Sequence, residues 1–169
     1  PHEISTWADG AYSAFAIDVD GDGDVDALSA SLYDDTVAWY ENADGVGGSW
    51  TRHVITTLAD WAFSVFAIDV DGDSDIDALS ASWSDNTIAW YENDDGAGKT
   101  WTTHTITTSC TDARSVFAVD MDGDGDVDVI SGTGGGRHRQ RCLVCVSFLR
   151  TNQTCMAADK HTEHIHFAK

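Results

Sequence analysis

The sequence predicts an all-β fold built from a repeated unit of four short antiparallel strands. Three observations support this prediction: a 51-residue internal repeat, β-branched and aromatic segments separated by turns, and the lack of a sustained helical period. Residues 15–65 align with residues 66–116 without a gap, and 34 of the 51 positions are identical. Similarity at this level indicates duplication of one structural unit.

Each repeat is predicted to contain four strands, A to D. In the first repeat, SAFAIDV and VDALSAS flank an acidic loop, TVAWYEN follows a polar turn, and WTRHVITT follows a glycine-rich connection. Four strands in a repeat of about 40–50 residues are typical of a β-propeller blade, which packs against neighbouring blades on both faces. The predicted fold is therefore a partial β-propeller of four-stranded antiparallel blades with an irregular C-terminal tail.

The repeat also predicts how the chain is divided. We expect residues 1–13 to form the outer strand of a preceding blade and a linker, residues 14–64 to form the first blade, and residues 65–115 the second. Residues 116–136 should form strands A and B of a truncated third blade. Residues 137–169 match nothing in the earlier repeats and hold six of the nine Lys and Arg residues. Our hypothesis is that this tail is disordered or is an aberrant end, such as a change of reading frame.

The tail contains side chains that could bind zinc. Their spacing is irregular and completes no known zinc motif, which argues against a structural zinc site. The potential donors are Cys142, Cys145, Cys155, His161, His164 and His166.

An acidic loop, DVDGDGDVD at residues 18–26, recurs as DVDGDSDID at residues 69–77 and as DMDGDGDVD at residues 120–128. Aspartates occupy relative positions 1, 3, 5, 7 and 9 of each copy, and so many carboxylates repel one another unless a cation neutralises them. Hard oxygen donors suit Ca²⁺, which takes 6–8 oxygens at about 2.3–2.6 Å. We therefore predict up to three Ca²⁺ ions, one for each loop. The candidate ligands are Asp18, Asp20, Asp22, Asp24, Asp26, Asp69, Asp71, Asp73, Asp75, Asp77, Asp120, Asp122, Asp124, Asp126 and Asp128.

The positions within each loop have different expected roles. The side chains at positions 1, 3 and 5 should point toward the ion, and position 9 should close the shell. Position 7 normally offers its backbone carbonyl, so its side chain (Asp24, Asp75 or Asp126) should lie behind the ligands or in solvent. Position 6 makes a sharp turn that glycine adopts at little cost, so we expect slight strain where Ser74 replaces it.

An EF-hand is excluded because it requires a Glu at position 12 and a helix on each side. Position 12 is Ser29, Ser80 or Ser131, and the flanking segments are predicted strands. A solvated acidic turn without a metal is the remaining alternative, but three copies in register favour a cation site.

Charge and hydropathy narrow the classes of function. The net charge of −20 disfavours nucleic acid and anionic membranes as partners. No apolar run approaches the roughly 18–20 residues of a membrane span. Three histidines, His2, His53 and His104, recur at one position of strand D, which indicates structural packing. No catalytic constellation is evident outside the loops, so we expect a protein that is not an enzyme.

The segment FAIDVDGDGDVDALSAS, followed by DTVAWYEN, resembles the FG-GAP or VCBS repeat family, the repeat of the integrin α-subunit propeller and of many secreted microbial proteins. The resemblance covers residues 2 to about 132. The calcium loop of that family, DxDxDGxxD, falls on positions 1, 3, 5 and 9 of each acidic loop. The resemblance implies a propeller with calcium at its A–B hairpins and an extracellular or cell-surface location.

The expected function is that of a non-catalytic, calcium-binding propeller fragment that recognises proteins or other ligands outside the cell, with calcium in a structural role. One alternative is a carbohydrate-binding, lectin-like propeller, because Trp83 replaces Leu32 of the first repeat and could form an exposed stacking platform. A second alternative is an accessory part of a polysaccharide-degrading enzyme. The expected partners are Ca²⁺, a protein or glycan ligand, and either the remaining blades of a longer parent chain or a second copy.

Overall fold

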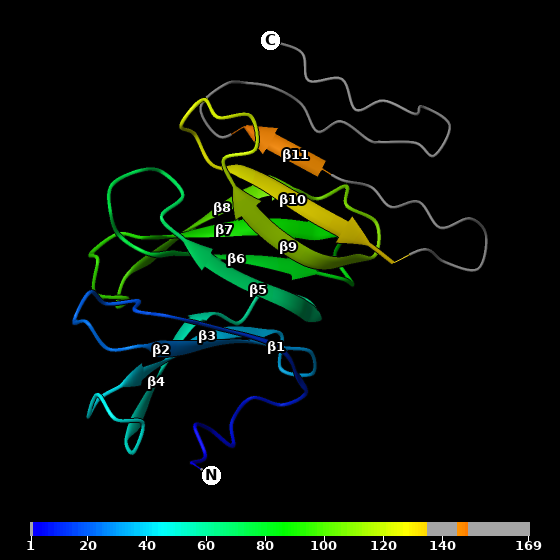
Figure 1. The fold of residues 1–169 in the computed structure, drawn as a ribbon. Helices are drawn as coiled ribbons and strands as arrows, with labels where there is room; N and C mark the ends of the chain where they lie inside the picture. The colour runs from blue at the N-terminus through cyan, green and yellow to red at the C-terminus, as the bar shows by residue number, and fades with distance from the viewer. Residues whose placement is uncertain (1, 135–144, 149–169) are drawn as a thin grey trace.

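The computed structural model describes residues 2–134 and 145–148, and these residues form strands, turns and loops but no helix (Figure 1). They build two four-stranded antiparallel sheets and a third sheet of three strands. The all-β, partial-propeller prediction is thus confirmed. Within the described residues there is accordingly no helix with the length and apolar character needed to cross a membrane.

The first two sheets are copies of one another, and in each the strands follow the chain order as a meander. Their inner hairpins share one register, because Ile17 pairs with Asp26 and Ile68 pairs with Asp77. The first sheet consists of β1 (Ala11–Ile17), β2 (Asp26–Ser31), β3 (Thr36–Asn42) and β4 (Trp50–Thr56). The second consists of β5 (Ala62–Ile68), β6 (Asp77–Ser82), β7 (Thr87–Asn93) and β8 (Trp101–Thr107).

The third sheet begins with the same inner hairpin, β9 (Ala113–Val119) and β10 (Asp128–Thr133). A short strand, β11 (Cys145–Phe148), pairs antiparallel with β10 on the side that β3 and β7 take in the other sheets. The repeat pattern predicts only strands A and B here. The added strand reflects the open edge of β10, whose unpaired backbone groups accept another extended segment. The remainder of the predicted tail lies outside the described residues.

Two further boundaries differ from the expectation. Strands β1, β5 and β9 each begin three residues before the predicted start of their repeat (residues 14, 65 and 116). The first residue of each strand pairs with the next strand across a register shift, outside the regular ladder. Residues 2–10 form no strand, although the sequence suggests an outer strand there. A strand needs a neighbour for its backbone hydrogen bonds, and no described strand pairs with this segment.

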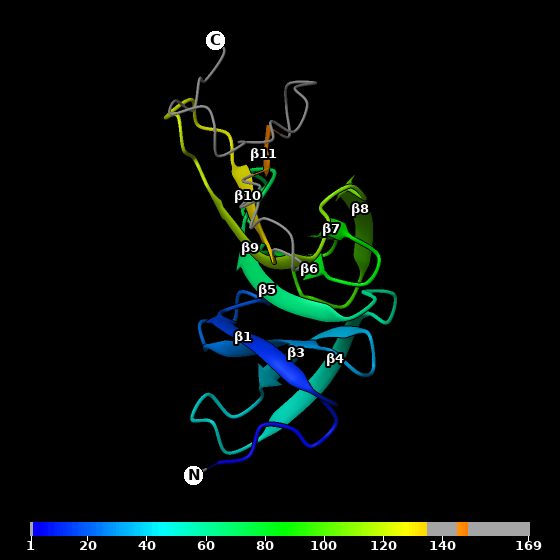
Figure 2. The ribbon, with the colours of Figure 1, turned by 90° about the vertical axis from the view of Figure 1, so that its right-hand side faces the viewer.

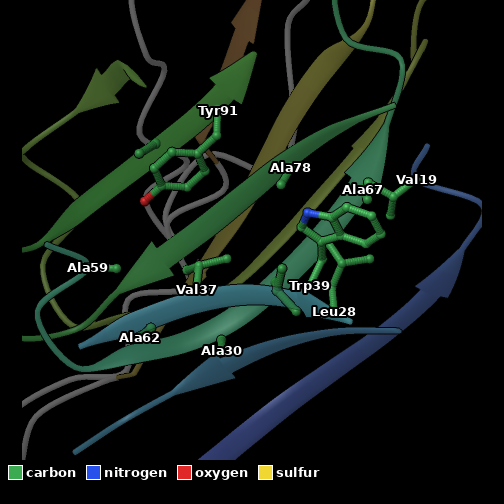
Figure 3. Packing of buried hydrophobic residues seen from close by; sticks show 12 residues of the cluster. Val19, Leu28, Ala30, Val37, Trp39, Ala59, Ala62, Ala67, Ala78 and Tyr91 are labelled. Carbon is green, nitrogen blue, oxygen red and sulfur yellow. The ribbon is translucent and has the colours of Figure 1, made fainter. Parts of the chain in front are cut away.

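The three sheets pack one on the next, with the inner strands β1, β5 and β9 side by side (Figure 2). The first core lies between the first and second sheets, where the fully buried indole of Trp39 lies near Leu28, Val19 and Ala67 (Figure 3). The second core lies between the second and third sheets and includes Leu79. Because the inner hairpins pack side by side, the acidic loops that connect their strands lie at the same end of the three sheets.

Candidate metal centres in the inner hairpins

Each acidic loop connects the two strands of an inner hairpin: β1 to β2, β5 to β6 and β9 to β10. The position-1 aspartate shapes the loop by accepting two backbone hydrogen bonds. In the first loop, Asp18 Oδ1 accepts the N–H of Gly21 at 2.8 Å and Oδ2 accepts the N–H of Gly23 at 2.9 Å. Asp69 and Asp120 accept the equivalent pairs of N–H groups in the other loops. The sequence therefore folds all three loops into one conformation.

Positive φ angles occur at two places in each loop. Position 6 is one of them, and Ser74 has φ of 82° where Gly23 has 95°. This geometry agrees with the strain expected of a non-glycine residue in the left-handed region. Position 4 is the other, where Gly21 has φ of 75°. The glycine that recurs at position 4 in every copy is the sequence signal for this second turn.

The carboxylates at positions 3 and 5 also accept backbone hydrogen bonds, and this turns them toward the loop interior. Asp22 Oδ1 accepts the N–H of Asp24 at 2.8 Å, and Asp20 Oδ1 accepts the N–H of Asp22 at 3.3 Å. Three carboxylates in each loop bring one oxygen each within 4.8 Å of one another: positions 1 and 3 in every loop, joined by position 5 in the first loop and by position 9 in the second and third. The three sets are Asp18, Asp20 and Asp22; Asp69, Asp71 and Asp77; and Asp120, Asp122 and Asp128.

The donor chemistry of these sets fits a hard divalent cation. Every donor is a carboxylate oxygen, and neither histidine nor cysteine contributes to the three sets. Oxygen-only donors suit Ca²⁺ or Mg²⁺ rather than Zn²⁺. If an ion binds, positions 1 and 3 would hold it in every loop, together with position 5 or position 9.

Position 9 is the buried member of each loop. Asp26 accepts the N–H of Val19 and the N–H of Asn42, both at 2.9 Å, and Asp77 accepts the matching N–H groups of Val70 and Asn93. This aspartate therefore joins the loop to the end of the third strand. In the third sheet, Asp128 Oδ2 accepts the N–H of Met121, but its buried Oδ1 has no hydrogen-bond partner among the described residues.

Burial raises the pKa of several loop carboxyls. Desolvation lifts the pKa of Asp77 to about 6, even though the N–H groups of Asn93 and Val70 favour its charged form. Desolvation also raises the pKa of Asp26 and of Asp128, and neighbouring carboxylates add to the effect. The metal-free loops thus hold negative charge at a cost that a bound cation would offset.

Position 7 does not join the three-carboxylate sets found among the described residues. The carboxylate of Asp24 instead lies against Gly45, where an added Cβ would come within 2.5 Å of an Asp24 oxygen. Asp75 lies in the same way against Gly96. Asp126 lines a cavity between the second and third loops. At positions 24 and 75 the side chain therefore packs against the loop that joins the third and fourth strands.

The cavity between the second and third acidic loops has a volume of about 260 Å³. Its lining includes Asp69 and Asp71 from one loop, Asp126 from the other, and the side chain of Trp90. The Trp90 indole also lowers the pKa of Asp77. Its N–H is buried but meets no acceptor at hydrogen-bond geometry among the described residues.

Two of the recurring histidines lie in equivalent packed positions. His53 stacks on Trp39 with ring centroids 4.4 Å apart, and its Nε2 lies 2.9 Å from Glu41. His104 stacks on Trp90 in the same way and contacts Glu92. These contacts support the structural role expected of the strand D histidines. Of the potential zinc donors in the tail, only Cys145 lies within the described residues, in β11. The other five donors lie outside the described residues.

Comparison with known families gives one match. The model of the FG-GAP-like repeat matches residues 18–80 and again residues 69–131. The two matches are offset by 51 residues. Each match begins at the first residue of one acidic loop and ends in the β-strand that follows the next acidic loop, β6 or β10. No curated protein matches the chain.

Proposed function

The chain belongs to the FG-GAP-like repeat family, and from this premise we propose that it is a non-catalytic propeller module whose three acidic loops bind Ca²⁺ for a structural purpose. The observation that carries the proposal is the shared loop conformation. In each loop, backbone N–H groups orient the carboxylates at positions 1, 3 and 5, and three carboxylate oxygens converge. Orientation before binding lowers the entropic cost of capturing an ion.

The role of the ion follows from the place of the loops. Each loop closes an inner hairpin, and its position-9 aspartate also holds the end of the third strand in the first two sheets. A bound Ca²⁺ would neutralise the converging carboxylates and fix both connections. Three ions would remove six of the 20 net negative charges and leave an acidic surface. This acidic surface and the family membership support protein or ligand recognition outside the cell as the wider function.

Calorimetric titration with Ca²⁺ tests the proposal directly. We expect binding in the range of about 10⁻⁴–10⁻³ M that is common for extracellular modules. A Ca²⁺ concentration ten times the Kd should stabilise the fold by about 1.4 kcal/mol for each occupied loop. Replacing Asp69 and Asp71 by Asn should remove one binding event, whereas Asp9→Asn, an exposed carboxylate outside the loops, should remove none. A titration without heat of binding up to 10⁻² M would refute calcium binding.

A second candidate function is carbohydrate binding, and an aromatic pair in the second sheet favours it. Trp61 stacks on Trp83 with ring centroids 4.9 Å apart and planes 22° apart. Trp61 is 40% exposed and has φ of 55°, an unusual conformation for a bulky residue. Trp83 itself is half-buried beneath this contact, so the outer stacking surface belongs to Trp61. Gly10 and Asp112 occupy the position of Trp61 in the other repeats.

A glycan array separates this candidate from protein recognition. Sugar binding through the pair should be lost in Trp61→Ala and weakened in Trp83→Ala. Trp7→Ala removes an exposed tryptophan outside the pair and serves as the control. If Trp7→Ala abolishes binding as well, or if the wild-type chain binds no glycan, the carbohydrate function is rejected.

A further inference from the structure

The inner strands β1, β5 and β9 each have two faces, one toward the preceding sheet (the front face) and one toward the following sheet (the rear face). The front faces of β5 and β9 are buried, because the first and second sheets cover them. The front face of β1 carries the same kind of small apolar residues, but these are exposed. The exposed residues are Ala11, Ala14 and Ala16, and their buried equivalents are Ala62, Val65, Ala67, Ala113, Val116 and Ala118.

The rear faces show the opposite pattern. The rear residues of β1 and β5 are half-buried under the following sheet, whereas those of β9 are exposed. Phe117 in particular is 49% exposed. The exposed residues are Ser115, Phe117 and Val119, and their half-buried equivalents are Ser13, Phe15, Ile17, Ser64, Phe66 and Ile68.

The acidic loops extend both faces. On the front side, Val25 is exposed, whereas its equivalents Ile76 and Val127 pack against the two cores. On the rear side, Met121 is exposed, whereas its equivalents Val19 and Val70 are buried. Each face is therefore a strand together with part of its loop.

The chain itself shows how a rear face joins a front face, because it makes this contact twice. Phe15 packs on Phe66, and Phe66 packs on Phe117, each with ring centroids 4.7 Å apart. The N–H of Val65 donates to Ser13 Oγ at 3.3 Å, and the N–H of Val116 donates to the equivalent Ser64 Oγ at 3.2 Å. The two junctions thus repeat both an aromatic and a polar contact.

At the rear of the third sheet these groups have no following sheet among the described residues. Phe117 is 49% exposed, whereas its equivalent Phe66 is half-buried and contacts the next sheet through Phe117. Ser115 Oγ accepts the N–H of Gly132 in its own sheet, at 3.1 Å, instead of an N–H from another sheet. The front face of β1 offers exposed Ala14, whose N–H is equivalent by position to the N–H groups of Val65 and Val116.

We propose that the rear face of β9 docks on the exposed front face of β1 of a second copy, head to tail. The contact repeats the two internal junctions, with Ser115 and Phe117 of one copy against β1 of the other. The front and rear faces are different surfaces, so the association is heterologous and builds a ring if its rotation closes or a filament if it does not. Each copy carries a charge of −20, so association strengthens with ionic strength, which screens repulsion over about 8 Å at 0.15 M.

Sedimentation of the full chain over a concentration series tests this proposal. The wild-type chain should reach the mass of two or more copies. Ala16→Arg blocks the front face and Val119→Arg blocks the rear face, and both residues are exposed in the single copy, so the fold tolerates each change. Each variant alone should keep the mass of one chain. Val46→Arg, an exposed residue of the loop between β3 and β4, should associate as the wild-type chain does.

The decisive measurement is the mixture of Ala16→Arg with Val119→Arg. The first variant retains its rear face and the second retains its front face, so the mixture should form a complex of two chains although neither variant associates alone. A symmetric, isologous contact would not be restored in this way. A wild-type chain that stays at the mass of one copy, variants that associate normally, or a mixture that stays dissociated would each overturn the proposal.

Discussion

The junction between the first and second sheets and the junction between the second and third sheets share their inner half but differ in their outer half. In the inner half, both contain the phenylalanine contact and the serine hydrogen bond. In the outer half, only the first junction contains hydrogen bonds between the described residues of neighbouring sheets. There the indole N–H of Trp39 donates to the carbonyl of Gly98 at 2.8 Å, and Asn93 Nδ2 donates to the carbonyl of Val19 at 3.3 Å.

The difference shows which strands encode which contacts. The inner half depends on the first two strands of a repeat, and the third sheet has both. The outer half depends on the end of the third strand and on the glycine-rich loop after it, which reach back over the preceding sheet. Within the described residues the third sheet has no counterpart of Asn93 and no glycine-rich loop, and the N–H of Trp90 and Oδ1 of Asp128 lack the partners that their equivalents have. The following predictions test whether these outer contacts stabilise the first junction.

The largest effect is expected from Gly98→Ala. Gly98 has φ of 65°, and an added Cβ would lie 2.6 Å from the buried ring of Trp39. Left-handed strain of about 1–2 kcal/mol and overpacking of about 1–3 kcal/mol should together lower the free energy of unfolding by about 3 kcal/mol. Urea unfolding monitored by tryptophan fluorescence measures the change.

Gly47→Ala is the matched control. Gly47 is the equivalent residue in the first sheet and has φ of 76°, but the nearest atom to its added Cβ is 3.6 Å away on Trp50. Only the backbone strain of about 1–2 kcal/mol should remain. Equal losses in the two variants would show that the contact between Gly98 and Trp39 adds nothing to the first junction.

Asp77→Ala should be about as damaging as Gly98→Ala. Its carboxylate accepts buried N–H groups from Val70 and Asn93, and each N–H left without an acceptor costs about 1–3 kcal/mol. We expect a loss of about 3 kcal/mol in the metal-free protein, measured by urea unfolding in EDTA. Asp128→Ala should cost about half as much, because Asp128 accepts only the N–H of Met121 among the described residues. A larger loss at Asp128 would contradict this comparison.

Trp39→Phe isolates the indole hydrogen bond. The change removes ring volume from the first core and leaves the carbonyl of Gly98 without its donor, so we expect a loss of about 2 kcal/mol. Trp90→Phe should cost about 1 kcal/mol less, because the N–H of Trp90 makes no hydrogen bond of good geometry among the described residues and interacts only weakly with the carboxylate of Asp77. Thermal unfolding of both variants beside the wild-type chain measures the difference. If Trp90→Phe is the more destabilising, the outer contact is not the cause.

Local patterns allowed much of the fold to be predicted. The segment TVAWYEN gives β3 with the predicted bounds, residues 36–42, because its residues favour a strand and a turn precedes them. The three acidic loops connect strands, as expected from the pattern on either side. The start of β1 was missed because the register shift between Ala11 and Ser13 depends on pairing with β2 rather than on local propensity.

Contacts between distant residues could not be predicted in the same way. Trp39 and Gly98 are 59 residues apart and meet only after two sheets pack. The replacement of Leu32 by Trp83 predicts an exposed platform, but Trp61, which is distant from Trp83 in the sequence, packs over it in the structure. The recurrence of Asn42 and Asn93 was visible in the sequence, yet their bond to position 9 of the loop needed the third strand to be placed beside the second.

The smallest expected effect is the pH dependence of the free energy of unfolding that Asp77 of the second acidic loop causes. Burial raises the pKa of Asp77 from 3.8 to about 6, so the folded chain binds a proton more tightly than the unfolded chain does. Between these two pKa values the folded state holds more protons, and stability must therefore fall as pH rises. In EDTA, the wild-type chain should lose about 1 kcal/mol from this group between pH 5 and pH 7. Asp77→Asn should reduce the slope by that amount, whereas Asp9→Asn should leave it unchanged. Urea unfolding at each pH measures the slopes, and an Asp77→Asn slope equal to that of the wild-type chain would show that this carboxyl is charged at no cost.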